Sequence, residues 1–199
     1  MNALLKFSKG VDWFSTVIGK ITMWLILATT LISAGNAIVR KIFNSSSNSL
    51  LEIQWYLFAA VFLLGAGYGF LKNSHVRIDF LSARFSARTR NWIDVIGILT
   101  ILFPFCIVVI ALSWPLFTQA FTSGEMSQNA GGLIRWPVYA LVPLGFALLM
   151  LQGLSELIKR IAFLTHQGPD VMSSEDAKSD EQKHIEELEA VSARQLAGQ

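Results

Sequence analysis

Long apolar runs alternate with short polar segments along this chain. Four runs are about 20 residues long, the length that a helix needs to cross a hydrocarbon core of roughly 30 Å. They cover approximately residues 21–39, 50–71, 93–114 and 136–158. Because these runs are apolar all round rather than amphipathic, the pattern predicts an all-α membrane protein with four transmembrane helices.

The residues before the first span follow a helical periodicity instead. Apolar residues recur there at steps of three and four, at Leu4, Phe7, Val11, Phe14 and Ile18. The charged residues Lys6, Lys9 and Asp12 point away from this apolar stripe. Such spacing gives a helix one apolar face. We therefore expect residues 1–20 to form an interfacial amphipathic helix that lies in the membrane surface, ahead of a four-helix transmembrane domain over residues 21–165.

Composition separates the membrane domain from the end of the chain. The sequence is 53% hydrophobic and 15% charged, whereas soluble domains have roughly 25% charged residues. Up to Gln167 there are 13 Lys and Arg against 6 Asp and Glu, but residues 168–199 hold 3 against 8. Residues 166–199 are therefore expected to form an acidic, disordered cytoplasmic tail.

Basic residues fall mainly on one side of the predicted spans. Ten lie before the first span, between the second and third, or just after the fourth, whereas the other two loops hold only Arg40, Lys41 and Arg135. Cytoplasmic loops are enriched in Lys and Arg. The N- and C-termini and the middle loop are thus expected to be cytoplasmic.

The second predicted span contains small residues that allow another helix to approach closely. Gly65 and Gly69 lie four residues apart, and Ala66 follows the first of them, a spacing typical of tightly packed membrane helices. The partner helix could belong to this chain or to another. At the start of the span, Ser49 and Glu52 have the spacing of a capping box, although Glu52 could instead face a substrate path.

Two prolines interrupt the later spans. Pro104 lies in the third span and Pro143 in the fourth. Each removes an amide donor, so we expect a kink at each position.

The loop before the third span has residues suited to the lipid interface, namely Arg84, Arg88 and Trp92. Arginine and tryptophan side chains reach the headgroup layer from nearby helices. Nucleic-acid binding by these arginines is disfavoured, because membrane spans lie on both sides of the loop.

Residue patterns for catalysis or cofactor binding are missing. The chain has one cysteine, Cys106, in a predicted span, and no Gly-rich phosphate loop that ends in Gly-Lys-Ser/Thr. His75 and Asp79 could share a metal ion, but two ligands are too few for a site. We therefore expect no enzyme, no cofactor and no bound metal.

Several stretches together resemble the small (Q, DctQ-type) membrane subunit of tripartite ATP-independent periplasmic (TRAP) transporters. The similar stretches span about residues 12–162 and are Leu51–Phe58, Phe62–Tyr68, His75–Asp79, Gly124–Ser127, Asn129–Leu133, Trp136–Pro137 and Val142–Phe146. Each stretch alone is weak, but their combination with four spans is specific.

The resemblance implies that the chain is one part of a larger machine. In such transporters a periplasmic solute-binding (P) protein captures a solute, usually an organic acid, and the large (M) membrane subunit carries the solute and sodium sites and moves like an elevator. The sodium gradient drives uptake. The small subunit is implied to be a non-catalytic scaffold in the bacterial inner membrane, with the M subunit, the P protein and membrane lipids as partners.

Some site residues follow from the resemblance. His75, Arg77 and Asp79 match the family's cytoplasmic His-Val-Arg-x-Asp stretch. Arg77 and Asp79 would pin the second helix to the surface helix through charge-assisted hydrogen bonds, or Arg77 would contact lipid phosphate. The residues expected on the periplasmic side, where they could meet the P protein, are Glu52, Glu125, Trp136 and Pro137.

A reading from another class also remains open. The chain could be an independent four-helix channel or small transporter that acts as a homo-oligomer through Gly65 and Gly69. The sequence names no solute for either reading.

Overall fold

The structure, a computed structural model, describes residues 2–43, 48–72 and 85–168. Four of the predicted site residues, His75, Arg77, Asp79 and Arg84, lie outside these ranges, as does nearly all of the predicted tail. Within the described ranges the regular structure is helical, apart from one isolated bridge between Met126 and Ile134.

Six helical elements follow one another along the described chain. They are α1 (Asn2–Phe43), α2 (Asn48–Leu71), α4 (Ala87–Gly97), the π-helical turn η1 (Ile98–Leu102), α5 (Phe103–Ser123) and α6 (Trp136–Leu164). Because α4, η1 and α5 follow one another without a break, they form one continuous helix of membrane-spanning length. The other three helices of this length are α1, α2 and α6. These four apolar helices confirm the predicted class, a multi-pass all-α membrane protein.

The helices are longer than the predicted spans. α5 ends at Ser123 rather than at residue 114, and α6 ends at Leu164 rather than at residue 158. The first span and the predicted surface segment belong to one continuous helix of 42 residues, about 63 Å long at 1.5 Å per residue. Part of α1 therefore extends beyond the hydrocarbon core, and how that part lies against lipid stays a prediction. The third helix begins at Ala87, ahead of the predicted residue 93, because charged residues lowered the hydropathy there without ending the helix.

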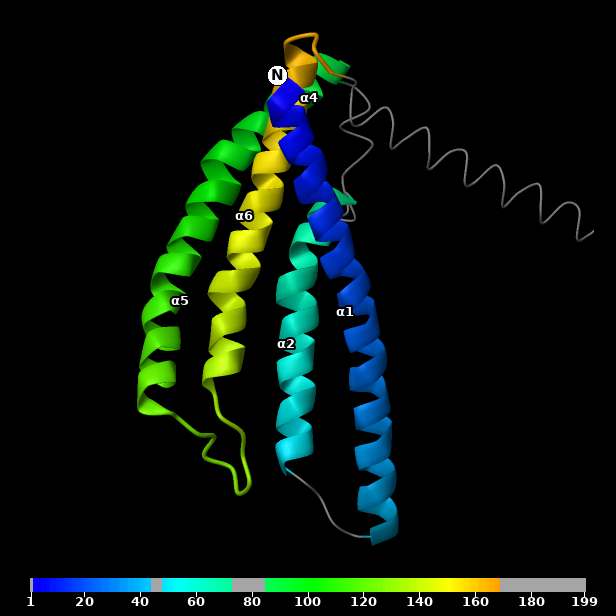
Figure 1. Ribbon diagram of the computed structural model, residues 1–199, viewed down its shortest axis with the longest axis vertical. Helices are drawn as coiled ribbons and strands as arrows, with labels where there is room; N and C mark the ends of the chain where they lie inside the picture. Colours follow the sequence, from blue (N-terminus) through cyan, green and yellow to red (C-terminus); the bar gives the residue numbers. More distant parts are fainter. Residues whose placement is uncertain (1, 44–47, 73–84, 169–199) are drawn as a thin grey trace, which may run out of the picture.

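The long helices lie side by side in an open layer, in the order α5, α6, α2, α1 (Figure 1). The central helix α6 packs against both α2 and α5, and the first part of α1 crosses to reach it as well. α1 and α5 form the two edges of the layer in this view. The arrangement leaves large apolar side chains exposed, among them Phe62, Ile101 and Leu112, at 80%, 71% and 70%.

Five of the seven buried residues of α1 are polar and follow one another at seven-residue steps. They are Ser8, Ser15, Thr22, Thr29 and Asn36; the other two are Val11 and Gly19. A seven-residue repeat keeps one face of a helix against a neighbour that crosses at a shallow angle, and small residues let the backbones approach. The larger apolar residues Phe7 and Phe14 are exposed on the outside of the same helix.

Irregular backbone surrounds the first of the two interrupting prolines. Pro104 lies in the first turn of α5, directly after η1. In this π turn the amide of Phe103 donates to the carbonyl of Ile98, which re-registers the backbone just before the residue that has no amide hydrogen. α6 continues through Pro143, which is buried inside the helix.

The closest helix approaches occur at glycines that the sequence pattern did not single out. A Cβ atom on Gly145 of α6 would lie 2.8 Å from the backbone oxygen of Leu63 in α2. The expected packing residues make looser contacts: Gly65 faces Thr22 at 3.8 Å, whereas Gly69 faces open space. Ala66 is half-buried. The α2–α6 contact thus depends most on Gly145.

A Gly145→Leu substitution is expected to destabilise the protein by about 1–3 kcal/mol, the usual cost of overpacking, because α2 must move away from α6. Thermal unfolding in detergent measures the change. Gly69→Leu is the matched control, since a Cβ atom there would have no neighbouring atom within 4 Å. Equal effects of the two substitutions would contradict this account of the α2–α6 contact.

Candidate functional site

Polar side chains gather at the two ends of the layer. The amino-end cluster lies where α1 begins and α6 ends, and it comprises Ser8, Asp12, Ser15, Asp94, Gln152, Ser155, Glu156, Lys159 and Arg160. The hairpin, residues 124–135, lies at the opposite end, between α5 and α6 (Figure 1). Each cluster joins segments that are distant in sequence.

Asp12 connects α1 to α6. One oxygen of its carboxylate accepts hydrogen bonds from Gln152 Nε2 at 2.9 Å and from Ser155 Oγ at 2.7 Å. The other accepts from Lys159 Nζ at 3.1 Å. Three donors on one face of α6 thus hold Asp12 against that helix, a contact that the sequence pattern did not predict.

Glu156 and Arg160 continue the cluster inside α6 and toward α4. Both residues are 1% exposed. Arg160 donates through Nη1 to Glu156 at 2.5 Å and through Nε to Asp94 at 3.0 Å. Glu156 also accepts a short hydrogen bond from Lys159. Because a buried charge is tolerated only when it is paired and hydrogen-bonded, these contacts depend on one another.

Two serines of α1 complete the contact with α6. The hydroxyls of Ser8 and Ser155 lie 2.7 Å apart, and Ser15 donates to Gln152 Oε1 at 2.7 Å. Sequence reasoning missed this cluster. Two sequence features indicated it. Polar residues near the end of the fourth span, from Gln152 to Arg160, are spaced three or four apart and so share one face of the helix, and the first helix carries polar residues at seven-residue steps.

Glu52 anchors the hairpin to the first turns of α2. Its carboxylate is 4% exposed and accepts hydrogen bonds from the Leu133 amide at 2.6 Å, from Asn129 Nδ2 at 2.8 Å and, over a short distance, from the Ser127 hydroxyl. The hydroxyl of Ser49 donates to the carbonyl of Gly131. The predicted capping box is wrong, since both side chains bond to the hairpin instead of to their own helix.

The hairpin has a defined backbone of its own. The amide of Ser127 donates to the carbonyl of Leu133, and that of Arg135 to the carbonyl of Glu125, both at 2.9 Å. Gly131 has a φ of 70°, a left-handed conformation that favours glycine. A further hydrogen bond joins the hairpin to α2: the hydroxyl of Tyr56 donates to the carbonyl of Ile134 at 3.1 Å. The hairpin is thus fixed from within and from α2.

Charged and aromatic residues flank the hairpin. Glu125 and Arg135 form an ion pair at 2.9 Å, with side chains about one-third exposed. A hydrogen bond with Tyr139 raises the pKa of Arg135 above its ordinary value. Trp136 opens α6 together with Pro137, and its ring meets that of Phe121 edge-on at 5.5 Å. All four predicted outer residues, Glu52, Glu125, Trp136 and Pro137, therefore lie at the hairpin end.

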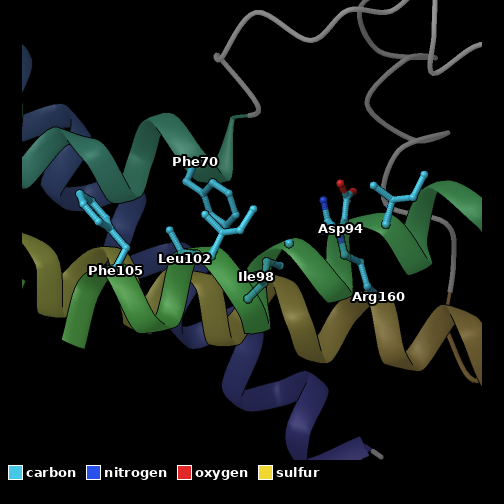
Figure 2. A pocket seen from close by; sticks show the side chains of 9 residues that line it. Phe70, Asp94, Ile98, Leu102, Phe105 and Arg160 are labelled. Atoms are coloured by element: carbon cyan, nitrogen blue, oxygen red, sulfur yellow. The ribbon is translucent and has the colours of Figure 1, made fainter. Parts of the chain in front are cut away.

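An apolar groove opens beside the amino-end cluster (Figure 2). It has a volume of about 340 Å³ and lies between the end of α2, the α4–η1–α5 helix and α6. Phe70, Ile98 and Leu102 line it, and the Asp94–Arg160 pair lies at one end. Arg88 and Trp92, two of the predicted lipid-interface residues, are exposed on α4.

The side chains of these clusters bond mainly to one another. Among the residues that the structure describes, no three His, Cys, Asp or Glu side chains are grouped to hold a metal ion. Cys106 is fully buried in α5. The chemistry that the arrangement provides is therefore cross-linking of helices by hydrogen bonds and ion pairs.

Replacing Glu156 by alanine is expected to destabilise the protein by about 3–5 kcal/mol, the typical cost of leaving one partner of a buried pair uncompensated. Chemical unfolding in detergent measures this change. Glu125→Ala removes an exposed pair instead and should cost no more than about 1 kcal/mol. A Glu156→Ala protein as stable as the Glu125→Ala protein would show that the buried pairs contribute little.

Glu52→Ala is expected to loosen the hairpin without unfolding the helices, because three donors lose their common acceptor. Hydrogen–deuterium exchange should become faster across residues 125–135 and stay unchanged in the second half of α6. Gln128→Ala, at an exposed position of the same hairpin, is the control. Unchanged exchange in the Glu52→Ala protein would mean that the hairpin holds its shape alone.

Comparison with known proteins gives this architecture a family. The family model for the DctQ component of tripartite ATP-independent periplasmic transporters matches residues 29–163, most of the described chain. A relative named C4-dicarboxylate TRAP transporter small permease protein DctQ, from Vibrio cholerae serotype O1, is 29% identical over 167 residues, covering 69% of this chain and 71% of the relative. No solved structure matches. The chain therefore belongs to the DctQ family, the small permease subunits of TRAP transporters.

Proposed function

We propose that this subunit is a non-catalytic scaffold for the large membrane subunit of a sodium-driven importer. The solute would be an organic acid or a similar small molecule, delivered by a periplasmic solute-binding protein. A family match to a tripartite periplasmic transporter supports the partners in general terms, and the sodium coupling and solute class are the finer part of the proposal.

The observation that best supports the scaffold role is that the polar side chains within the layer bond to other groups of this chain. The carboxylates of Asp12, Glu52 and Glu156 each accept several hydrogen bonds from other side chains or amides of this chain. A solute site needs polar groups that are available to the solute. Here these groups brace the helices, which suits a rigid support for a moving subunit.

The outer surfaces of the layer suit an apolar partner. Large apolar residues on α2 and α5, such as Phe62 and Leu112, are exposed, and in a membrane they must contact lipid or another apolar helix. Large exposed apolar surfaces are typical of interaction sites. We propose that the large subunit covers part of this surface.

The orientation that we propose puts the amino-end cluster on the cytoplasmic side and the hairpin in the periplasm. It follows from the excess of Lys and Arg at the amino end. On this basis we propose that the motif His75, Arg77 and Asp79 acts on the cytoplasmic side, and that Arg84, Arg88 and Trp92 meet the lipid interface.

In this orientation the hairpin is available to the solute-binding protein. Met126 and Ile134 are exposed at 56% and 38% on a hairpin that Glu52 holds in place. A surface that is already ordered loses less conformational entropy on binding. The hairpin therefore suits a docking role, with Met126 and Ile134 as the apolar contacts.

Deleting this chain is expected to abolish solute uptake in cells that retain the large subunit and the solute-binding protein. Re-expression of the chain should restore uptake.

A Met126→Ser variant should weaken docking of the solute-binding protein roughly fivefold, the effect of losing an interface contact of about 1 kcal/mol. The control is Gln119→Ala, at an exposed position near the same end of α5, which should leave docking unchanged.

Two outcomes would contradict the proposal. Normal uptake without this chain would exclude a required scaffold. Solute transport by the purified chain alone in liposomes would identify it as an independent transporter or channel.

A further inference from the structure

We propose that the acidic segment, residues 169–199, docks on a basic stripe of α1 that consists of Lys6, Lys9 and Lys20 with Trp13 between them. The contact ties the end of the chain to the start of the layer. It goes beyond the scaffold role and does not depend on it. It rests on the exposed lysines of the stripe, on the place where α6 ends, and on the charge of the segment that follows.

The basic stripe lies on an exposed face of the first half of α1. Its four residues follow one another at steps of three, four and seven, so they share one face of the helix. All four are exposed, Trp13 at 68%. Ser8 and Ser15, which bond to α6, lie on a different face. The stripe is therefore open to a further partner while α1 keeps its contact with α6.

The lysines of the stripe form no ion pair within the part of the chain that the structure describes. The ion pairs there use Arg135, Lys159 and Arg160 as their cations. Asp12 is the single carboxylate of α1, and it accepts its hydrogen bonds from α6. Three lysines on one exposed face thus lack a counter-charge among the described residues, which favours an anionic partner.

The acidic segment begins beside the stripe. α6 ends at Leu164, and a Cβ atom on Gly168 would lie 3.2 Å from that of Ala162 in the last turns of α6. These turns lie at the same end of the layer as the start of α1 (Figure 1). From Lys6 to Lys20 the stripe is about 21 Å long at 1.5 Å per residue, whereas a polypeptide of 31 residues spans about 30 Å on average even as a random coil. The segment therefore reaches the whole stripe.

The chemistry of the acidic segment complements that of the stripe. The segment contains 8 Asp and Glu against 3 Lys and Arg. Its stretch 185–189 reads Ile-Glu-Glu-Leu-Glu, so carboxylates for the lysines and apolar side chains for the ring of Trp13 come from the same few residues. A stripe of cations around one exposed aromatic ring matches this mixture of charged and apolar groups.

Covalent attachment makes weak contacts sufficient. A single exposed ion pair contributes little to stability and is screened by salt. A tether raises the local concentration of a partner to about the millimolar range when the linker is short, so several weak pairs together hold the segment. Anionic lipid headgroups compete for the same lysines, but they are not attached to the layer.

Carbodiimide cross-linking of the full chain in phosphatidylcholine nanodiscs tests the proposal, because the reagent joins a lysine amine to a carboxylate with which it is in contact. We expect mass spectrometry to find links from the lysines of the stripe to acidic residues beyond Gly168. Their yield should fall at about 0.5 M salt, where exposed ion pairs are screened. The matched control is Lys41, exposed at the other end of α1, which should give no such links.

A second measurement does not use the lysine amines. Trypsin cleavage after Lys183 should become about fivefold faster in a Lys6→Gln/Lys9→Gln/Lys20→Gln variant, since cleavage follows the undocked population. The control variant Arg40→Gln/Lys41→Gln removes two exposed cations at the other end of α1 and should be cleaved at the wild-type rate. Both variants should unfold at the wild-type temperature.

Several results would overturn the proposal. They are the absence of links at the stripe, equal links at Lys41, and equal cleavage of the two variants. Mixing isotope-labelled and unlabelled chains shows whether links form only between two copies, which would also exclude docking within one chain. Loss of the links when phosphatidylglycerol replaces part of the phosphatidylcholine would assign the stripe to lipid headgroups instead.

Discussion

Pairing of charges across helices is the interaction on which the layer depends. In lipid, helices gain little from burying apolar surface, so close packing and interhelical hydrogen bonds must hold them together. Asp12 joins α1 to α6 through Lys159, and Arg160 joins α6 to α4 through Asp94. Because Glu156 contacts both cations, loss of any member leaves a charge without its partner, so the cluster acts as a unit.

The middle of the layer is held differently from its ends. At both ends a carboxylate on one element takes donors from another, as Glu52 does from the hairpin. Between them the helices approach through small residues: a Cβ atom on Gly19 would lie 2.3 Å from the ring of Tyr68, and one on Gly145 would meet Leu63. Directional bonds thus set the register of the helices, and backbone contact sets their separation.

Sequence predicted the elements well and their contacts poorly, for a physical reason. The bilayer fixes the length of a spanning run, so four runs gave four helices. Which face of a helix meets which neighbour is a tertiary choice. The periodicity placed Asp12 off the apolar face of its own helix but gave no sign of the three donors on α6. Glu52 and Ser49 likewise fitted a local capping box, although the distant hairpin supplied their partners. The predicted third span likewise began only after Arg88 and Arg90, although the helix begins at Ala87.

The polarity of the layer is reversed relative to a soluble helix bundle, and this connects the fold to the proposed role. Small polar residues of α1 face inward, and Phe62 and Leu112 face outward. An outward apolar surface can contact lipid or a larger membrane subunit without any rearrangement of the polar groups, because those groups already bond to one another. A subunit built in this way would offer a partner a fixed shape, which suits the scaffold role that we propose.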